Sequence, residues 1–178
     1  MAREIVHRGR KIQVALDISE TPDGQIIKRD MIFHPGAVVI LPVVDKDHIC
    51  LLKNYRFVID QTLWECPAGT LELNEPLQHA AERELLEETG YEAAELISLG
   101  RLYEYPTKES HTVYPFLAVN AAWVSSQKLD VGEIIEVVKI PLSTIQQQVV
   151  SGNINVAVSI ATIFRAIEKL KEIDHMGE

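Results

Sequence analysis

Short apolar runs separated by turn sequences occupy the first third of the chain. The segments KIQVALDI (residues 11–18) and QIIKRDMIF (residues 25–33) flank TPDG at residues 21–24. Proline, aspartate and glycine favour a tight turn, so this pattern predicts an antiparallel hairpin. Two continuous apolar runs follow, AVVILPVV (residues 37–44) and ICLLKNY (residues 49–55). Their length and their β-branched residues predict two buried central strands.

A helical period begins after this region. Leu77, Ala81 and Leu85 recur at intervals of four, which places them on one face of an α-helix. The side chain of Asn74 can accept a hydrogen bond from a first helical turn, so we expect it to cap the helix. Gly90 stands where a helix commonly ends. The pattern predicts an amphipathic helix of about four turns.

The second half of the chain continues to alternate extended and helical segments. We expect strands at residues 95–105, 112–124 and 136–142, a short helix at 143–152 and a longer helix at 155–173. Strands on both sides of a central helix, with another helix at the end, favour a mixed sheet between helices. Residues 1–36 are predicted to form a separate hairpin unit, and residues 37–178 the main domain.

Composition restricts the class of protein. With 178 residues, of which 47% are hydrophobic and 24% charged, the chain has the apolar content of one folded domain. Its formal net charge of −9 repels nucleic acid, so we expect no such partner, and any phosphate site needs local cations or metal. We find no segment of membrane-spanning length and no signal peptide. Two cysteines cannot build a disulfide framework, so a cytoplasmic protein is expected.

Three carboxylates crowd the end of the expected helix. Glu84 precedes Glu87 by three residues and Glu88 by four, so the three side chains share one face. Like charges at this spacing oppose each other by about 0.2–0.5 kcal/mol per pair on an exposed helix. A hard cation such as Mg²⁺ would reverse the sign of that interaction. Taken alone, the cluster is also typical of a solvated acidic helix face.

The residues around the cluster resemble the Nudix box. That motif runs Gly, five residues, Glu, seven residues, Arg-Glu, an aliphatic residue, any residue, Glu-Glu, any residue, Gly and an aliphatic residue. The matching positions are Gly69, Glu75, Arg83, Glu84, Leu85, Glu87, Glu88 and Gly90. Tyr91 replaces the last aliphatic residue, at a packing position. Seven fixed positions at about one chance in fifteen each coincide roughly once in 10⁸ windows, so the match is specific.

The resemblance implies the Nudix fold over residues 37–178, an α/β/α sandwich with a mixed central sheet, and hydrolysis of nucleoside diphosphates linked to another group. It also implies a bound Mg²⁺ or Mn²⁺ ion. The ligands that it assigns to this ion are Glu84, Glu88, Glu87 (direct or through water) and the backbone carbonyl of Ala68. Arg83 is expected to orient a glutamate. Gly69 is expected to let the backbone approach the substrate closely.

Further segments resemble the ADP-ribose pyrophosphatase branch of that family. WECPAG at residues 64–69 is similar to its Glu-x-Pro-Ala-Gly sequence, and NYR at residues 54–56 to its Gln-Tyr-Arg strand end. Pro106 lies where the branch carries a proline. The N-terminal hairpin resembles strands through which these enzymes dimerise. A homodimer with a small nucleotide substrate is therefore expected.

The same resemblance gives substrate roles to residues near these segments. Arg56 would pair with a phosphate, which suits an anionic substrate on an acidic protein. Glu65 either contacts the base or ribose or belongs to a structural ion pair. Trp64 either stacks on an adenine or fills the sheet's core, and the second alternative is favoured.

The sequence does not decide which residue is the base that activates the attacking water. Many enzymes of the branch carry a glutamate five residues before the phenylalanine of a Phe-Leu-Ala strand. Counted back from Phe116, that position is His111, and Glu109 lies two residues earlier. Glu109 is preferred because a loop can shift register and a carboxylate can also bind metal. Histidine side chains in general change charge near neutral pH, which makes His111 the second alternative. A box glutamate such as Glu84 or Glu87 is the third alternative.

The expected reaction is Mg²⁺-dependent hydrolysis of the pyrophosphate bond of ADP-ribose or a related ADP-sugar into AMP and a sugar phosphate. The alternatives are another nucleotide sugar such as GDP-mannose, a dinucleoside polyphosphate, and a module that binds nucleotides without cleaving them. The intact box favours an enzyme. Glu133 and Glu136 lie at the start of an expected strand and could reach the site, but carboxylates there are usually solvated, and we leave them out.

Overall fold

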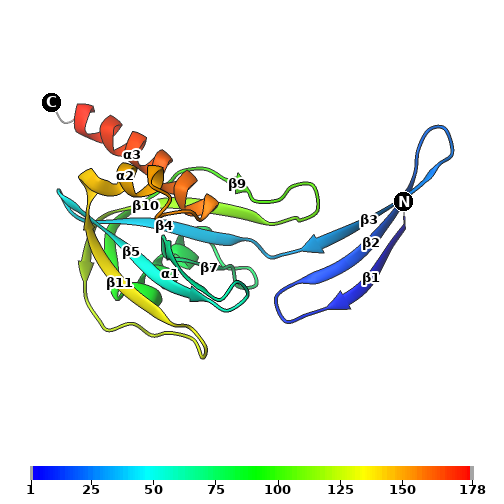
Figure 1. The fold of residues 1–178 in the computed structure, drawn as a ribbon, viewed down its shortest axis with the longest axis horizontal. Helices are drawn as coiled ribbons and strands as arrows, with labels where there is room; N and C mark the ends of the chain where they lie inside the picture. Colours follow the sequence, from blue (N-terminus) through cyan, green and yellow to red (C-terminus); the bar gives the residue numbers. More distant parts are fainter. Residues whose placement is uncertain (1, 177–178) are drawn as a thin grey trace.

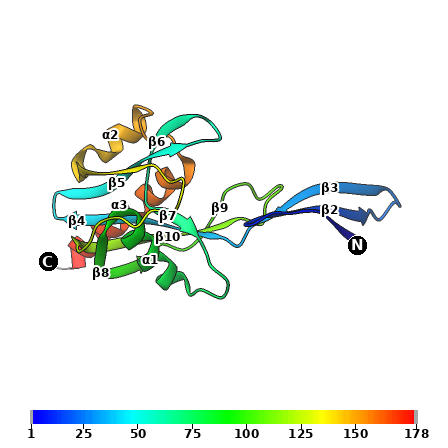
Figure 2. The same cartoon turned by 90° about the horizontal axis from the view of Figure 1, so that it is seen from below.

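Three antiparallel strands form a separate sheet at the N-terminus. The computed structural model describes residues 2–176, and in it β1 (Ala2–Arg8), β2 (Gln13–Glu20) and β3 (Ile26–Phe33) lie in the order β1-β2-β3. The expected hairpin is the β2–β3 pair, in which Gln13 lies opposite Phe33. This sheet extends away from the rest of the molecule (Figures 1 and 2).

Strand β1 adds a third strand to the expected hairpin. All of its residues except Ile5 are exposed, so it has no buried face that an alternating pattern would reveal. The strand is held by backbone pairing with β2, where Ala2 lies opposite Ile18 and Arg8 opposite Gln13. Its position therefore depends on its partner strand rather than on its own apolar residues.

The main sheet has eight strands of mixed direction. Its strands are β4 (Ala37–Asp45), β5 (His48–Arg56), β6 (Gln61–Glu65), β7 (Ala68–Thr70), β8 (Tyr91–Ser98), β9 (Leu102–Tyr103), β10 (Thr112–Trp123) and β11 (Ile135–Pro141). The order along the sheet is β11-β5-β4-β10-β8, with β6 on β5, β7 on β4 and β9 on β10. Because β4 and β10 are parallel and the other pairs antiparallel, the predicted mixed sheet is confirmed.

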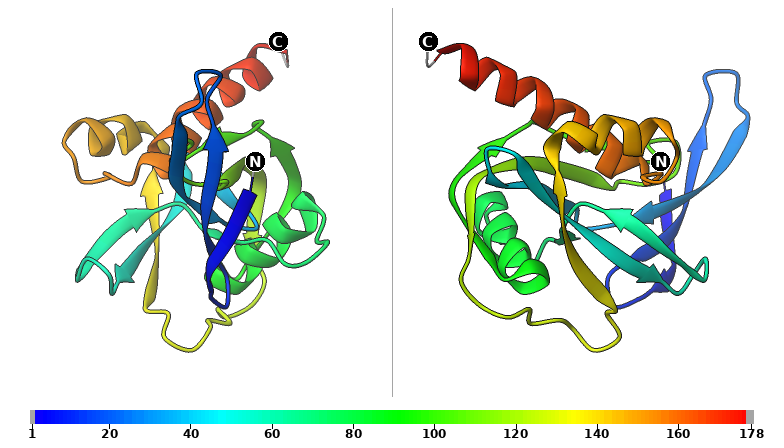
Figure 3. Two further views of the ribbon diagram at one scale, coloured as in Figure 1. Left: turned by 90° about the vertical axis from the view of Figure 1, so that its right-hand side faces the viewer. Right: turned by 60° about the vertical axis from the view of Figure 1, so that its left-hand side comes forward.

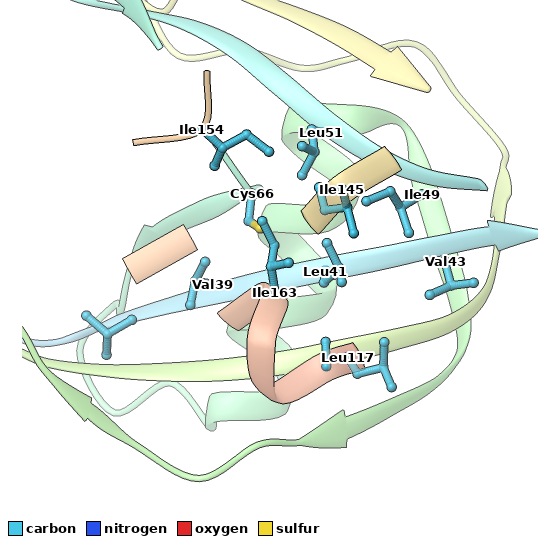
Figure 4. Packing of buried hydrophobic residues seen from close by; sticks show 12 residues of the cluster. Val39, Leu41, Val43, Ile49, Leu51, Cys66, Leu117, Ile145, Ile154 and Ile163 are labelled. Atoms are coloured by element: carbon cyan, nitrogen blue, oxygen red, sulfur yellow. The ribbon is translucent and has the colours of Figure 1, made fainter. Parts of the chain in front are cut away.

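Alternate residues of β4 face two different layers. The helices are α1 (Leu77–Thr89), the 3₁₀ helix η1 (Leu142–Thr144), α2 (Ile145–Val150) and α3 (Ala157–Met176). Val39 and Leu41 pack in a core with residues of α2 and α3, seen from close by in Figure 4. Val38 and Ile40 pack with residues of α1. Helices thus cover both faces of the sheet (Figure 3, right), which confirms the α/β/α sandwich.

Helix α1 begins later than the sequence predicts. Its N-cap residue is Pro76, without a side-chain cap hydrogen bond, and Asn74 has a φ of 62°. Asn74 is therefore not the cap, because it adopts the left-handed conformation that asparagine tolerates in loops. The buried residues Ala81 and Leu85 confirm the predicted face of the helix. Gly90, with a φ of 75°, confirms the predicted end.

The expected strand at residues 95–105 is divided in the structure. Strand β8 begins earlier, at Tyr91 directly after the C-cap residue of α1, and β9 follows only after a break. Gly100 lies in that break with a φ of 89°, which interrupts the extended backbone. Across residues 2–176, the helices lack the combination of length and apolar character that crossing a bilayer requires.

Candidate active site

Helix α1 and strand β7 hold two glutamates against an alanine and a glycine. A Cβ atom placed on Gly69 would overlap the carboxyl group of Glu84. The φ of Gly69 lies outside the left-handed range. The amide nitrogen of Ala68 donates a 2.7 Å hydrogen bond to Oε2 of Glu88. The glycine of the box is therefore needed for the close approach of a carboxylate, and not for an unusual backbone angle.

Arg83 binds one of these carboxylates, that of Glu84, together with those of Glu75 and Glu87. Its Nε and Nη2 donate to the two oxygens of Glu75 at 2.8 and 2.9 Å. Its Nη1 donates to Oε1 of Glu84 at 2.7 Å and to Oε2 of Glu87 at 3.2 Å. The hydrogen bonds that Arg83 donates to Glu75, followed by the hydrogen bond to Glu84, raise the pKa of Arg83 against the effect of burial. Arg83 contacts the glutamates as the sequence predicts and offsets their mutual repulsion.

Two of these carboxylates, Glu84 and Glu88, have raised pKa values. Burial raises the pKa of Glu88 to about 8, although the backbone of Ala68 lowers it. Burial also raises the pKa of Glu84, against the effect of Arg83. A divalent cation would stabilise the charged form of both groups, and carboxylate oxygens are the donors that Mg²⁺ and Mn²⁺ prefer. The donor set therefore fits such an ion.

The carboxylates line a cleft of about 460 Å³. Its other charged residues are the cations Arg10, Lys11, Arg56, Arg83 and Lys128 and the acids Glu72, Asp130 and Glu133. Glu133, which sequence reasoning left out, contributes to raising the pKa of both Glu84 and Glu88. A cleft lined by these carboxylates and cations suits a ligand that carries several phosphate oxygens.

Comparison with known proteins decides the family. The model of the NUDIX domain matches residues 33–156, so the chain belongs to that family. This chain is a Nudix hydrolase. An ADP-ribose pyrophosphatase of Bacillus subtilis (strain 168) is 36% identical over 143 residues, covering 80% of this chain and 77% of that protein. A methanol dehydrogenase activator of Bacillus methanolicus is 29% identical over 147 residues, covering 82% and 80%.

Solved structures agree with the sequence comparison. The crystal structure of an ADP compounds hydrolase matches this Nudix hydrolase with a TM-score of 0.85 and 27% identity. The match covers 97% of this chain and 93% of that one. Because the coverage includes both parts of the chain, the N-terminal sheet belongs to the shared structure.

In this Nudix hydrolase, Arg56 and Glu65 form a two-point ion pair. Nε of Arg56 donates to Oε1 of Glu65 at 3.0 Å, and Nη2 donates to Oε2. The Glu65 side chain is 6% exposed, whereas that of Arg56 is 46% exposed and lines the cleft. Of the two alternatives for Glu65, the structure shows the ion pair. Arg56 therefore faces a ligand with its charge partly balanced.

A second hollow of about 380 Å³ adjoins the cleft of the hydrolase, since both are lined by Gly69 and its neighbours. His111 and Glu104 line this hollow. Nδ1 of His111 lies 2.7 Å from Oε2 of Glu104, and the His111 side chain is 15% exposed. Nε2 of His111 is buried and has no hydrogen-bond partner among residues 2–176. Glu104 was not a candidate, because the sequence places it inside an expected strand.

Two further groups complete the surroundings of His111. The ring of His34 lies 4.0 Å from that of His111, centroid to centroid. Burial, followed by the charge of His111, lowers the pKa of His34. Ligand atoms of Glu104, Glu109 and His111 lie within 4.8 Å of one another, a set that could also hold a cation. The structure thus brings both loop candidates for the base, Glu109 and His111, into one cluster.

Trp64 and Pro106 line neither hollow of the hydrolase. Trp64 is half-buried and packs against the core, and Nζ of Lys53 lies 5.2 Å from the centre of its ring. This matches the favoured alternative, a tryptophan of the sheet's core. Pro106 is exposed in a turn after β9.

Proposed function

We propose that this hydrolase cleaves the pyrophosphate bond of ADP-ribose or a related ADP-sugar, giving AMP and a sugar phosphate. The observation that carries the proposal is the cradle in which Glu84 lies against Gly69 and Glu88 against Ala68. Similarity to an ADP-ribose pyrophosphatase and to an ADP compounds hydrolase supports this choice of substrate. The hollow beside the cleft offers space for one of the two groups that flank the diphosphate.

The residues that would hold Mg²⁺, or Mn²⁺, are Glu84, Glu87, Glu88 and the backbone carbonyl of Ala68. When bound, such an ion neutralises the diphosphate, stabilises the charge on the leaving phosphate and acidifies a water molecule. The Glu87 side chain is 42% exposed and that of Glu84 only 12%, so Glu87 suits a contact through water. Arg83 holds both of these carboxylates in place through its hydrogen bonds.

For the acceptor of the water's proton we propose His111 ahead of Glu109. The hydrogen bond between Nδ1 and Glu104 fixes the ring and leaves Nε2 as an acceptor without a partner among residues 2–176. The Glu104 carboxylate would also stabilise the ring after it has taken the proton. Glu109 stays the alternative, because its carboxylate belongs to the same cluster.

A substrate panel tests the proposed reaction. ADP-ribose, GDP-mannose and a diadenosine polyphosphate are compared with Mg²⁺ present, and products are identified by mass. We expect ADP-ribose to have the highest kcat/KM and to yield AMP. If ADP-ribose ranks below the other compounds, the substrate is another nucleotide derivative. If it binds without being cleaved, the protein is a nucleotide-binding module.

Two variants test the metal site within the same assay. Glu88→Gln and Glu87→Gln keep the size of the side chain and remove the charge that an ion needs. We expect Glu88→Gln to lower kcat/KM by about 10²-fold or more, with a smaller loss for Glu87→Gln. Unchanged hydrolysis in both variants would refute the metal assignment.

Substitutions in the loop separate the two candidate bases. We expect His111→Ala to lower kcat by about 10²–10⁴-fold, the usual contribution of a general base. Glu109→Ala is the matched control from the same loop, and we expect it to lower kcat less. A larger loss for Glu109→Ala would return the role to the carboxylate.

We further infer that the enzyme is a homodimer formed through residues 1–36. Strand β1 is an edge strand, and an exposed edge offers unpaired backbone groups to a second chain. Light scattering of the full chain and of a chain lacking residues 1–36 tests this inference. A full chain with the mass of a monomer would refute it.

A further inference from the structure

The loop between β10 and β11 is tied to the last turn of α1. This loop, residues 124–134, passes close to the end of the helix (Figure 3, right). The amide nitrogen of Lys128 donates a 2.8 Å hydrogen bond to the carbonyl of Glu87. The amide nitrogen of Val124 donates to the carbonyl of Gly90 at 2.9 Å. The loop therefore provides partners for carbonyl groups that the end of a helix leaves without an intrahelical donor.

The side chain of Gln127 adds a further contact to the same turn. Its Nε2 donates to the carbonyl of Glu88 at 2.6 Å and, more weakly, to the carbonyl of Ile135 at 3.4 Å. Ile135 is the first residue of β11, and Gln127 is partly buried between the two acceptors. A single side chain thus joins the end of the acidic helix to the strand that follows the loop.

The charge at this end of α1 explains why such donors are needed. The C-terminus of a helix carries a partial negative charge, which favours basic residues in the last turn. Helix α1 has no basic residue in its last turn, where Glu87 and Glu88 lie instead. The N–H groups of the loop supply the opposite partial charge. They therefore stabilise an arrangement that the helix by itself disfavours.

Glu88 is held at both its side chain and its backbone. Its Oε2 accepts the hydrogen bond from the amide nitrogen of Ala68 on β7, and its carbonyl accepts the one from Gln127. The residue is 5% exposed, so its carboxylate has little room to compensate for a movement of the backbone. A shift of the last turn would therefore displace the carboxylate or break its bond to β7.

The rest of the loop is a compact turn that lines the cleft. The amide nitrogen of Asp130 donates to Oε2 of Glu133 at 2.9 Å, and the amide nitrogen of Glu133 donates to the carbonyl of Asp130 at 3.1 Å. Both residues line the cleft together with Lys128. Because the turn is closed on itself, its position relative to α1 depends on the bonds made by Gln127 and Lys128.

We propose that Gln127 is a positioning residue for the hydrolysis: its amide holds the end of α1 against the loop, so that the Glu88 carboxylate keeps the position that a metal ion requires. The inference rests on the proposed function, because it takes Glu88 as a ligand of that ion. Gln127 lines neither hollow, so it acts through Glu88 and not on the substrate.

The response of the enzyme to Mg²⁺ tests this role. Gln127→Met keeps the length of the side chain and removes the N–H donor, and Gln147→Met makes the same change at an exposed position of α2. Residues that orient metal ligands contribute about 10–100-fold to metal affinity or activity. We expect Gln127→Met to raise the Mg²⁺ concentration for half-maximal activity by about 10-fold or more, with KM for ADP-ribose changed less than about 3-fold. The control should match the wild type, and equal Mg²⁺ responses of the two variants would overturn the proposal.

Thermal unfolding separates positioning from stability. The loss of one hydrogen bond costs about 0.5–1.5 kcal/mol, which lowers Tm by about 1–6 °C for a chain of this length. Gln127→Met should therefore be folded in the assay. A lowered Tm with an unchanged Mg²⁺ response would mean a structural role only, and it overturns the proposal. Gln127→Glu keeps the shape of the side chain but replaces the donor with an oxygen, so a wild-type Mg²⁺ response in this variant would also overturn it.

A binding measurement keeps the inference separate from the proposed reaction. Mn²⁺ is titrated without substrate into the wild type and both methionine variants, and free Mn²⁺ is followed by electron paramagnetic resonance. Binding at least about 10-fold weaker in Gln127→Met alone supports the inference. If the wild type binds Mn²⁺ but fails to cleave ADP-ribose, the proposed reaction is refuted and the titration still tests Gln127. Equal affinities of the wild type and Gln127→Met, or a wild type that binds no Mn²⁺, would overturn the inference.

Discussion

Replacing Gly69 with alanine tests the physical reason for the first glycine of the box. The added Cβ would overlap all three atoms of the Glu84 carboxyl group, so either the carboxylate or strand β7 must move. Because the φ of Gly69 lies outside the left-handed range, alanine adds no backbone strain there. The whole effect should therefore come from the displaced carboxylate.

The size of that effect follows from packing and from catalytic geometry. Overpacking of a closely packed site costs about 1–3 kcal/mol. For a chain of this length, such a loss lowers Tm by about 2–12 °C, at roughly 2–4 °C per kcal/mol. Misplacing a catalytic group by about 1 Å lowers the rate by about 10²-fold. We expect kcat/KM for ADP-ribose to fall by that factor in Gly69→Ala.

The assay combines thermal unfolding with steady-state kinetics, and Gly152→Ala is the control. Gly152 has a φ of 79° and no atoms within 4 Å of a new Cβ, so alanine there strains the backbone without touching a side chain. We expect the control to keep full activity. Gly69→Ala added to Glu84→Gln should cost little further activity, because the affected carboxylate is already gone. Gly69→Ala with activity within about 3-fold of the wild type would refute the reasoning.

Three further substitutions probe other parts of the structure. Glu104→Gln should reduce stability near pH 6 and have less effect in acid. The hydrogen bond with His111 lowers the pKa of Glu104 below 4.5, so its stabilising effect is present above that value and is lost as the pH falls through the lowered pKa. If this is wrong, unfolding at a series of pH values would show a constant difference in stability between the variant and the wild type. Arg56→Ala should lower the free energy of unfolding by about 3 kcal/mol, because it leaves the buried Glu65 without its partner. Denaturant unfolding measures this loss, and an unchanged midpoint would contradict the pairing. Gly90→Ala should lower Tm more than Gly152→Ala. Both positions have a left-handed φ, but only at Gly90 would the new Cβ also overlap a backbone oxygen. Equal melting temperatures of the two variants would contradict this.

Features that depend on local spacing could be predicted from the sequence. Glu84, Glu87 and Glu88 share a helix face because of the helical period alone, and the match to the Nudix box predicts a metal-binding role for them. The ends of α1 differ in this respect. Gly90 ends the helix as predicted. Asn74 is not the N-cap, because it adopts a left-handed conformation in the loop before the helix.

Features that depend on pairing between distant segments could not be predicted in this way. Strand β1 has no buried face, so its pattern resembles that of a loop, and only pairing with β2 defines it. Glu133 is an exposed residue of the loop before β11, and it lines the cleft together with residues of α1. Such residues are placed by the folded chain, and their local sequence carries no sign of the site.

The sequence by itself determined the family, the helix that carries the three glutamates and the layered fold, because each depends on the period of a single element or on a motif with fixed spacing. The tertiary structure alone decided which groups surround that helix. It paired His111 with Glu104, and it brought Arg10 and Lys11 from the N-terminal sheet to the cleft. The physical reason is that a side chain's neighbours across a cleft are set by strand register and loop closure, which act between segments far apart in the chain.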